Sequence, residues 1–211
     1  RPLSKPETRA MMFLRAQTLS EGHSGCRPQV IELVLNMLNR GVHPLIPEKG
    51  SVGASGDLAP LAHLALGMIG EGQAEFEGET MAAMDALSRA SLRPLVLEAK
   101  EGLSLVNGTQ AMSAVGSLAL LAAEHLCRLA DVAGAMTLEG LRGIPKAFDQ
   151  RIQDIRPHPG QATSASNLRR MLEGASCTAG DSANRVQDPY SLRCQPQVMG
   201  ACHDQIQFVG E

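Results

Sequence analysis

The chain has 211 residues, a formal net charge of −3 at pH 7 and a hydrophobic share of 44%, which suits a globular protein with an apolar core. The weak charge and the lack of a Lys/Arg stripe argue against partners such as nucleic acid or an anionic membrane. The longest apolar run, 111–121, is too short to span a membrane and is followed by Glu124 and Arg128.

The first half of the chain predicts helices separated by a glycine-rich loop. Apolar residues at helical spacing predict helices over 7–19 and 28–40, and the second is opened by Pro28 and closed by Gly41. A rigid loop over 43–47 and the glycine-rich run 50–56 follow. We expect Asp57 to cap a helix that runs to about residue 69.

The second half also predicts helices. Alternating residues over 73–77, ahead of Gly78, predict a short β-hairpin, and we expect Thr80 to cap a helix that ends at Arg89. The longest helix is expected over about 109–133, and it should be buried because Ala, Leu and Met surround it. Segment 157–166 is expected to be a loop, and Pro196 to open the final helix. The predicted fold class is mainly α, with long Gly-rich loops and a short β-hairpin.

The five cysteines indicate the compartment rather than a cross-linked framework. Their number is odd and they are widely spaced, which argues against disulfides and a structural zinc site. We therefore expect reduced thiols, a cytoplasmic protein and no metal. The chain begins at Arg1 and ends in a helical pattern without a cap, so we expect both ends to be truncations.

The segment 50–63 carries the most chemical information, and it reads Gly-Ser-Val-Gly-Ala-Ser-Gly-Asp-Leu-Ala-Pro-Leu-Ala-His. In a tight bend, the backbone nitrogen of Gly56 can attack the carbonyl carbon of Ala54, since glycine adopts strained backbone angles at low cost. Loss of water from the new ring and from Ser55 then leaves 4-methylidene-imidazol-5-one, a strong electrophile. The tripeptide alone would occur by chance in about one chain of this size in ten, so a flexible loop with an Asp cap is the plain alternative.

Three segments in order resemble the aromatic amino acid ammonia-lyases, and among them the histidine ammonia-lyases. Besides 50–63, segment 100–110 reads Lys-Glu-Gly-Leu-Ser-Leu-Val-Asn-Gly-Thr-Gln. Segment 186–200 reads Val-Gln-Asp-Pro-Tyr-Ser-Leu-Arg-Cys-Gln-Pro-Gln-Val-Met-Gly, and its first half is typical of histidine lyases. The similarity covers essentially the whole chain, so residues 1–211 are interpreted as the central part of one such domain.

The resemblance implies a role for each matching residue. The tripeptide becomes the prosthetic ring, an aspartate assists cyclisation or dehydration, and an arginine clamps the substrate carboxylate through a bidentate pair. An asparagine, a tyrosine and, less strongly, a glutamine contribute polar groups near the ring and the substrate. The residues at these positions are Ala54, Ser55, Gly56, Asp57, Asn107, Gln187, Tyr190 and Arg193. The structural alternatives are helix caps for Asp57 and Asn107, an ion pair for Arg193 and a packing role for Tyr190. His63 is interpreted as a packed core histidine.

The implied reaction is non-oxidative loss of ammonia from L-histidine to give trans-urocanate, with no external cofactor, in a homotetramer. The alternatives are a tyrosine or phenylalanine ammonia-lyase or aminomutase, or a non-catalytic scaffold when the chain is isolated. In the family, the base that removes the β-proton is a tyrosine upstream of the electrophile, and a histidine, a glutamate and a phenylalanine complete the pocket. None of these positions falls within this chain, so we expect the isolated chain to be inactive.

Overall fold

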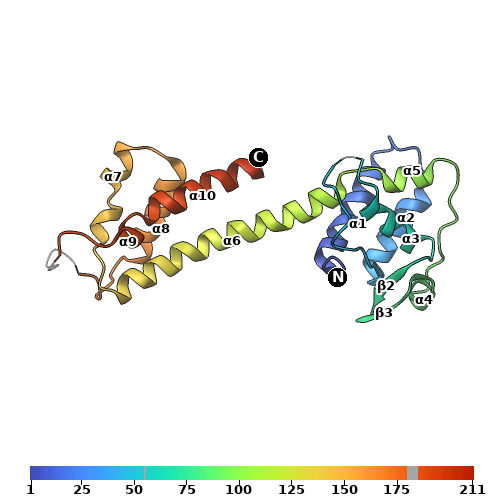
Figure 1. Ribbon diagram of the computed structural model, residues 1–211, viewed down its shortest axis with the longest axis horizontal. Helices are drawn as coiled ribbons and strands as arrows, with labels where there is room; N and C mark the ends of the chain where they lie inside the picture. Colours follow the sequence, from blue (N-terminus) through green and yellow to red (C-terminus); the bar gives the residue numbers. More distant parts are fainter. Residues whose placement is uncertain (55, 180–184) are drawn as a thin grey trace. The chain divides into compact units, whose positions relative to one another are not determined.

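The computed structural model describes residues 1–54, 56–179 and 185–211, which form two compact units, Arg1–Leu118 and Ala119–Glu211. Helices dominate both units (Figure 1), which confirms the prediction of a mainly α protein. In order, the elements of the first unit are α1 (Lys5–Ser20), α2 (Pro28–Arg40), β1 (His43–Pro44), α3 (Ala59–Met68), β2 (Gln73–Phe76), β3 (Glu79–Ala82), α4 (Ala83–Arg89), α5 (Glu101–Val106) and the beginning of α6 (Gln110–Gly140).

The helices α1 and α2 form the centre of the first unit, and both match the predictions. Ser4 and Glu7 make a capping box at the beginning of α1. Pro28 opens α2, and Gly41 ends it in the left-handed region at φ 76°. The two helices pack against each other through fully buried apolar side chains, which include Met11, Met12, Val30, Val34 and Met37.

The predicted hairpin is confirmed as β2 and β3, but its surroundings differ from the prediction. His43 pairs with Glu75, so the segment expected as a rigid loop contributes a short strand, β1, to a three-stranded antiparallel sheet. The prediction that Thr80 caps a helix is wrong, because Thr80 pairs with Glu75 inside β3. The helix α4 begins only at Ala83.

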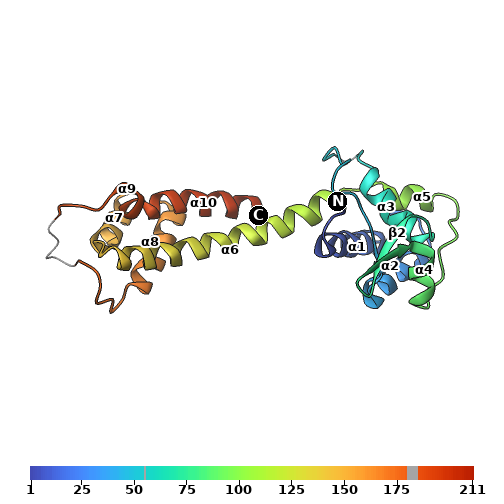
Figure 2. The same ribbon diagram turned by 60° about the horizontal axis from the view of Figure 1, so that its bottom comes forward.

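The second unit continues α6 and adds η1 (Pro145–Phe148), α7 (Gln150–Ile155), α8 (Pro159–Met171), α9 (Tyr190–Arg193) and α10 (Gln195–Gly210). Figure 2 shows α8 and α10 side by side. They approach closely at two glycines, because a Cβ on Gly200 would overlap the backbone of Gln161, and one on Gly160 would overlap that of Gly200. Pro196 lies in the first turn of the final helix, as predicted.

The prediction of a loop over 157–166 is wrong, because α8 begins at Pro159. Proline and glycine at its start suggest a loop, but in the first turn of a helix proline loses no hydrogen bond. The following Ser164, Ala165 and Leu168 then form the buried face of α8.

The long helix α6 is longer and far more exposed than predicted. It extends to Gly140, and Leu121, Leu126 and Met136 are 59%, 64% and 68% exposed. The stretch Glu101–Gly140 contains an 18-residue window of mean hydropathy 1.3 that is 17% buried, so by length and composition alone it could cross a membrane. Apolar helices of non-membrane proteins meet the same criterion. The sequence predicted a buried helix here, whereas the apolar surface of α6 lies largely outside the core.

Candidate active site

The signature loop is held from within by Asp57. The Asp57 carboxylate, 8% exposed, accepts hydrogen bonds from the Ser51 hydroxyl, from the Val52 N–H at 2.9 Å and from the Gly53 N–H at 3.4 Å. The Ser51 hydroxyl, with help from the backbone N–H groups, holds the pKa of Asp57 below its usual value against the opposing effect of burial. The N-cap of α3 is Leu58, so Asp57 lies one residue before the predicted cap position. The Ala59 N–H also lowers the pKa of Asp57, so the side chain fastens the loop and reaches the first residue of α3.

A backbone hydrogen bond links Ala54 to Asp57 in the same loop, because the Asp57 N–H donates to the Ala54 carbonyl oxygen at 3.0 Å. Gly53 lies in the left-handed region at φ 65°, and no atom lies within 4 Å of a Cβ built on Gly56. Ser55 lies outside the described residues. The space beside the Gly56 Cα is thus open, and a donor already lies on the carbonyl that the Gly56 nitrogen would attack.

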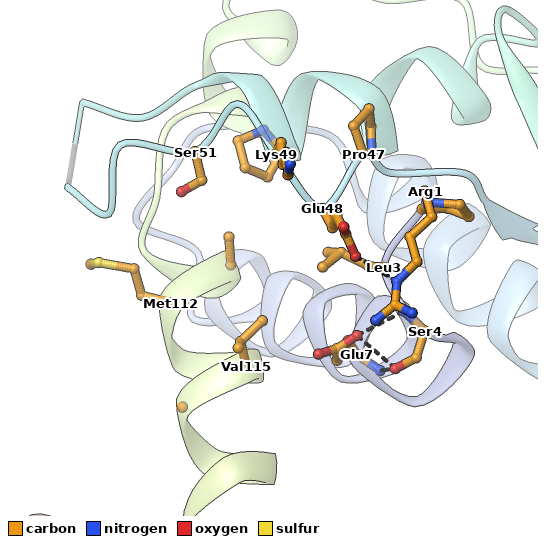
Figure 3. Close-up of a pocket in the computed structure, with 14 residues that line it drawn as sticks. Arg1, Leu3, Ser4, Glu7, Pro47, Glu48, Lys49, Ser51, Met112 and Val115 are labelled. Atoms are coloured by element: carbon orange, nitrogen blue, oxygen red, sulfur yellow. Dashed lines mark hydrogen bonds and ion pairs between the residues drawn. The ribbon is translucent and has the colours of Figure 1, made fainter.

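A cavity of about 980 Å³ lies beside the beginning of the loop. Figure 3 shows Ser51 at this cavity, with Met112 and Val115 of α6 and charged side chains from the first residues of the chain. Arg1 pairs there with Glu48, with 2.7 Å between Nε and Oε2. The first unit therefore offers a mixed apolar and charged cavity next to the signature loop, with the volume of a small-molecule site.

Asn107 ends α5 instead of capping the long helix. Its backbone is extended, at φ −99° and ψ 111°, its N–H donates to the Leu103 carbonyl, and the residue is exposed. The side chain is thus displayed at the junction between α5 and α6. Below the junction, the Gln110 amide oxygen accepts a hydrogen bond from Arg15 of α1, at 3.0 Å.

The second unit carries the other candidate residues, on and before the one-turn helix α9. Gln187 and Arg193 line one cavity of about 390 Å³, together with Lys146 and Gln197. The Arg193 guanidinium lies over the Tyr190 ring, 5.4 Å from its centroid. The Nε atom of Arg193 is buried and has no hydrogen-bond partner within the described part of the chain. Arg193 thus brings a guanidinium to this cavity, and a guanidinium suits the binding of an anion.

The chain is similar to known proteins in sequence and in structure. The profile of the family described as aromatic amino acid lyase matches residues 1–211. The chain belongs to the aromatic amino acid lyase family. A protein of Myxococcus xanthus named histidine ammonia-lyase is 58% identical over 208 residues, which are 98% of this chain and 41% of that protein. Two solved structures are also similar. The histidine ammonia-lyase from Trypanosoma cruzi has a TM-score of 0.88 at 41% identity, and the match covers 99% of this chain and 38% of that chain. The phenylalanine ammonia-lyase from Rhodosporidium toruloides has a TM-score of 0.89 at 36% identity, and the match covers 99% of this chain and 32% of that chain.

The chain spans about two fifths of the length of the curated relatives it matches. Its candidate residues fall into two groups. Ala54, Gly56, Asp57 and Asn107 belong to the first compact unit. The motif with Gln187, Tyr190 and Arg193 belongs to the second. Within the second group the structure brings Gln187 and Arg193 to one cavity, whereas Tyr190 is 64% exposed and lines another.

Asp188 is a further residue that shapes the motif 186–200, and the sequence alone did not single it out. Asp188, 4% exposed, accepts hydrogen bonds from the Ile144 N–H at 2.6 Å and from the Arg185 Nε at 2.7 Å. It fastens the motif to the turn that follows α6. An acidic residue next to a proline inside a recognised motif is a signal that could have identified it.

The described residues contain no group of three or more His, Cys, Asp or Glu side chains able to hold a metal ion. Each of the five cysteines is a free thiol in the structure. His63 is half-buried on α3 and lines a cavity of about 430 Å³, so it is less enclosed than the predicted core histidine.

Proposed function

We propose that the protein carrying this chain is a histidine ammonia-lyase, which removes ammonia from L-histidine without oxidation and yields trans-urocanate in histidine catabolism. Relatives of that name are up to 58% identical over nearly all of the chain, and the segment 187–194 is typical of histidine lyases. Because the chain spans about two fifths of these relatives, the activity is proposed for the whole protein.

The observation that carries this proposal is the hydrogen bond from the Asp57 N–H to the Ala54 carbonyl oxygen, in a loop that the Asp57 side chain holds. The residues fit an internally formed 4-methylidene-imidazol-5-one ring, because this carbonyl oxygen already accepts a hydrogen bond and the space beside the Gly56 Cα is open. That N–H would stabilise negative charge on the oxygen as the carbon is attacked. The ring, once formed, supplies an electrophile, which ordinary side chains lack, and no external cofactor is needed.

The other candidate residues bind and orient the substrate. The planar guanidinium of Arg193, with a free Nε, suits a bidentate pair with the amino acid carboxylate. Gln187, at the same cavity, adds an amide. Asn107 offers an exposed amide at the α5–α6 junction. The Tyr190 ring, stacked against Arg193, restricts the rotamers of the guanidinium and so orients the clamp.

We further propose a homotetramer in the cytoplasm. The exposed apolar side chains of α6, such as Leu126 and Met136, form the kind of surface that a subunit interface covers. The five free thiols suit a reducing compartment.

Purified full-length protein tests the proposal when it is supplied separately with L-histidine, L-tyrosine and L-phenylalanine. Urocanate is followed by its ultraviolet absorbance, and kcat/KM for histidine should exceed that for the other two by about tenfold or more, since polar ring recognition discriminates strongly. A preference for tyrosine or phenylalanine would instead support the alternative suggested by the similarity to phenylalanine ammonia-lyase. Ser55→Ala is the matched control, because it removes the hydroxyl that must be eliminated and should abolish turnover of all three substrates.

A further inference from the structure

A buried cation without a counter-charge lies in the core of the first unit. Arg15 of α1 is 2% exposed, and within the described ranges no carboxylate forms an ion pair with it. Burial lowers the pKa of Arg15, and its Nε atom has no hydrogen-bond partner in the same residues. Since a buried guanidinium without an anion is unfavourable for folding, an apolar side chain would stabilise this position better. The guanidinium therefore calls for an explanation other than packing.

Gln110, the first residue of α6, is the partner of Arg15. Its amide oxygen accepts a hydrogen bond from Arg15 Nη1 at 3.0 Å, and its amide nitrogen donates to Thr18 Oγ1 at 3.0 Å. Thr18 in turn donates to the Leu14 carbonyl at 2.9 Å. Both ends of the Gln110 amide are thus used, and α6 is fastened at its first residue to two positions on α1. We call Arg15, Thr18 and Gln110 the α1–α6 clamp.

Gly108 lies directly against this clamp. A Cβ atom on Gly108 would overlap the Gln110 amide oxygen and Arg15 Nη1. The glycine is needed there for space, because its φ is not in the left-handed region. The turn that carries Asn107 and Gly108 therefore packs directly against the side chains of the clamp.

We propose that Arg15 is a positioning residue, which acts through Gln110 and Gly108 to fix the Asn107 amide at the α5–α6 junction. The proposal rests on the proposed function, in which Asn107 lies near the substrate. Hydrogen bonds are directional and a buried network has few alternative arrangements, so such a network fixes geometry where an apolar contact would allow sliding. The other side of Asn107 is held independently, because the buried Glu101 carboxylate at the beginning of α5 pairs with Arg27.

The experiment compares Arg15→Met, Arg15→Lys, Gly108→Ala and Leu19→Ala in the full-length protein. Leu19 is another fully buried residue of α1, outside the clamp, and it controls for loss of stability. We expect Arg15→Met and Gly108→Ala to lower kcat by about 10- to 100-fold with a smaller change in KM, because misplacement of a catalytic-site group by about 1 Å has effects of this size. Arg15→Lys retains a donor for Gln110 and should recover part of the loss, while Leu19→Ala should lower the melting temperature with kcat within about twofold of wild type.

Hydrogen exchange of peptides that cover 104–113, followed by mass spectrometry, provides a readout independent of turnover. Exchange in this segment should be faster in Arg15→Met and Gly108→Ala than in Leu19→Ala. Equal exchange and an unchanged kcat in Arg15→Met would overturn the proposal and leave Arg15 a structural residue. If the wild type turned over none of the three amino acids, the proposed function would fail, and the exchange comparison would still decide whether the clamp fixes the turn.

Discussion

Replacing Glu101 by Gln should destabilise the first unit, because this carboxylate is almost fully buried and fully used. Its side chain is 2% exposed, and it accepts hydrogen bonds from the backbone N–H (3.1 Å), Nε (2.8 Å) and Nη2 (2.8 Å) of Arg27 and from the Glu98 N–H (2.8 Å). Each carboxylate oxygen accepts two of these bonds. A glutamine must turn its NH₂ group toward one pair of donors, so two bonds are lost and the charge opposite Arg27 disappears. We expect a loss of about 2–4 kcal/mol in unfolding free energy.

Glu98 provides a matched control, because it pairs with the same guanidinium. Its side chain is 62% exposed, and its Oε1 lies 2.7 Å from Arg27 Nη1. Glu98→Gln should cost less than about 1 kcal/mol, as exposed ion pairs contribute little. Urea unfolding followed by circular dichroism measures both variants, and similar slopes allow the midpoints to be compared. A loss below about 0.5 kcal/mol for Glu101→Gln, or an equal loss for both variants, would refute the reasoning.

The same pair predicts a pH dependence of known sign. The Arg27 side chain lowers the pKa of Glu101 from 4.5 to about 2, with smaller help from backbone N–H groups. A carboxylate with a lowered pKa stabilises the folded state fully above its unfolded value, and this contribution is lost as the pH falls through the folded value. The stability difference between wild type and Glu101→Gln should therefore be constant above pH 4.5 and shrink as the pH falls toward about 2. A difference that grows on acidification would contradict this assignment.

Three further predictions test the rest of the account. Arg193→Lys keeps the charge but loses the planar fork, so kcat/KM of the full-length enzyme should fall by about two decades, and an unchanged value would give Arg193 a structural role. Gly200→Ala should lower the melting temperature at a cost of about 1–3 kcal/mol because the methyl group overlaps Gln161, whereas Gly116→Ala, which faces open space, should not lower it. The 211-residue chain alone should produce no measurable urocanate, because its one tyrosine, Tyr190, is assigned to orienting Arg193 and no other tyrosine can remove the β-proton. Turnover comparable to the full-length enzyme would require a base among the residues of the chain.

The fold was most predictable where local chemistry decides the element. Pro28 and Gly41 mark the two ends of α2 because their preferred backbone angles suit those positions, and the structure has these boundaries. At the beginning of α8 the same residue types were misleading. This helix packs against α10, which is distant in the sequence, so the local residues do not show the contact. The exposure of α6 was unpredictable for a related reason. Composition shows that a helix is apolar, but not which surface covers it.

The candidate site shows the same division between local and distant information. The signature motif identified Asp57, but its hydrogen bonds to Ser51 and Val52 depend on the bend of the loop, which composition does not give. The contact between Arg15 and Gln110 joins residues 95 positions apart, and nothing in either local sequence marks it. Motifs therefore identify which residues take part in the chemistry, whereas the residues that hold them in place become visible only when distant segments are brought together.

The mass of the full-length protein, measured intact and then after digestion, tests the central claim most directly. In an active preparation, the peptide that contains Ala54 and Gly56 should be lighter than its sequence by two waters, one from ring closure and one from the Ser55 side chain. The corresponding peptide of the Ser55→Ala variant cannot lose the water that comes from the side-chain hydroxyl. A wild-type peptide of unmodified mass in a preparation that converts L-histidine to urocanate would contradict the account, because turnover would then proceed without the internal electrophile.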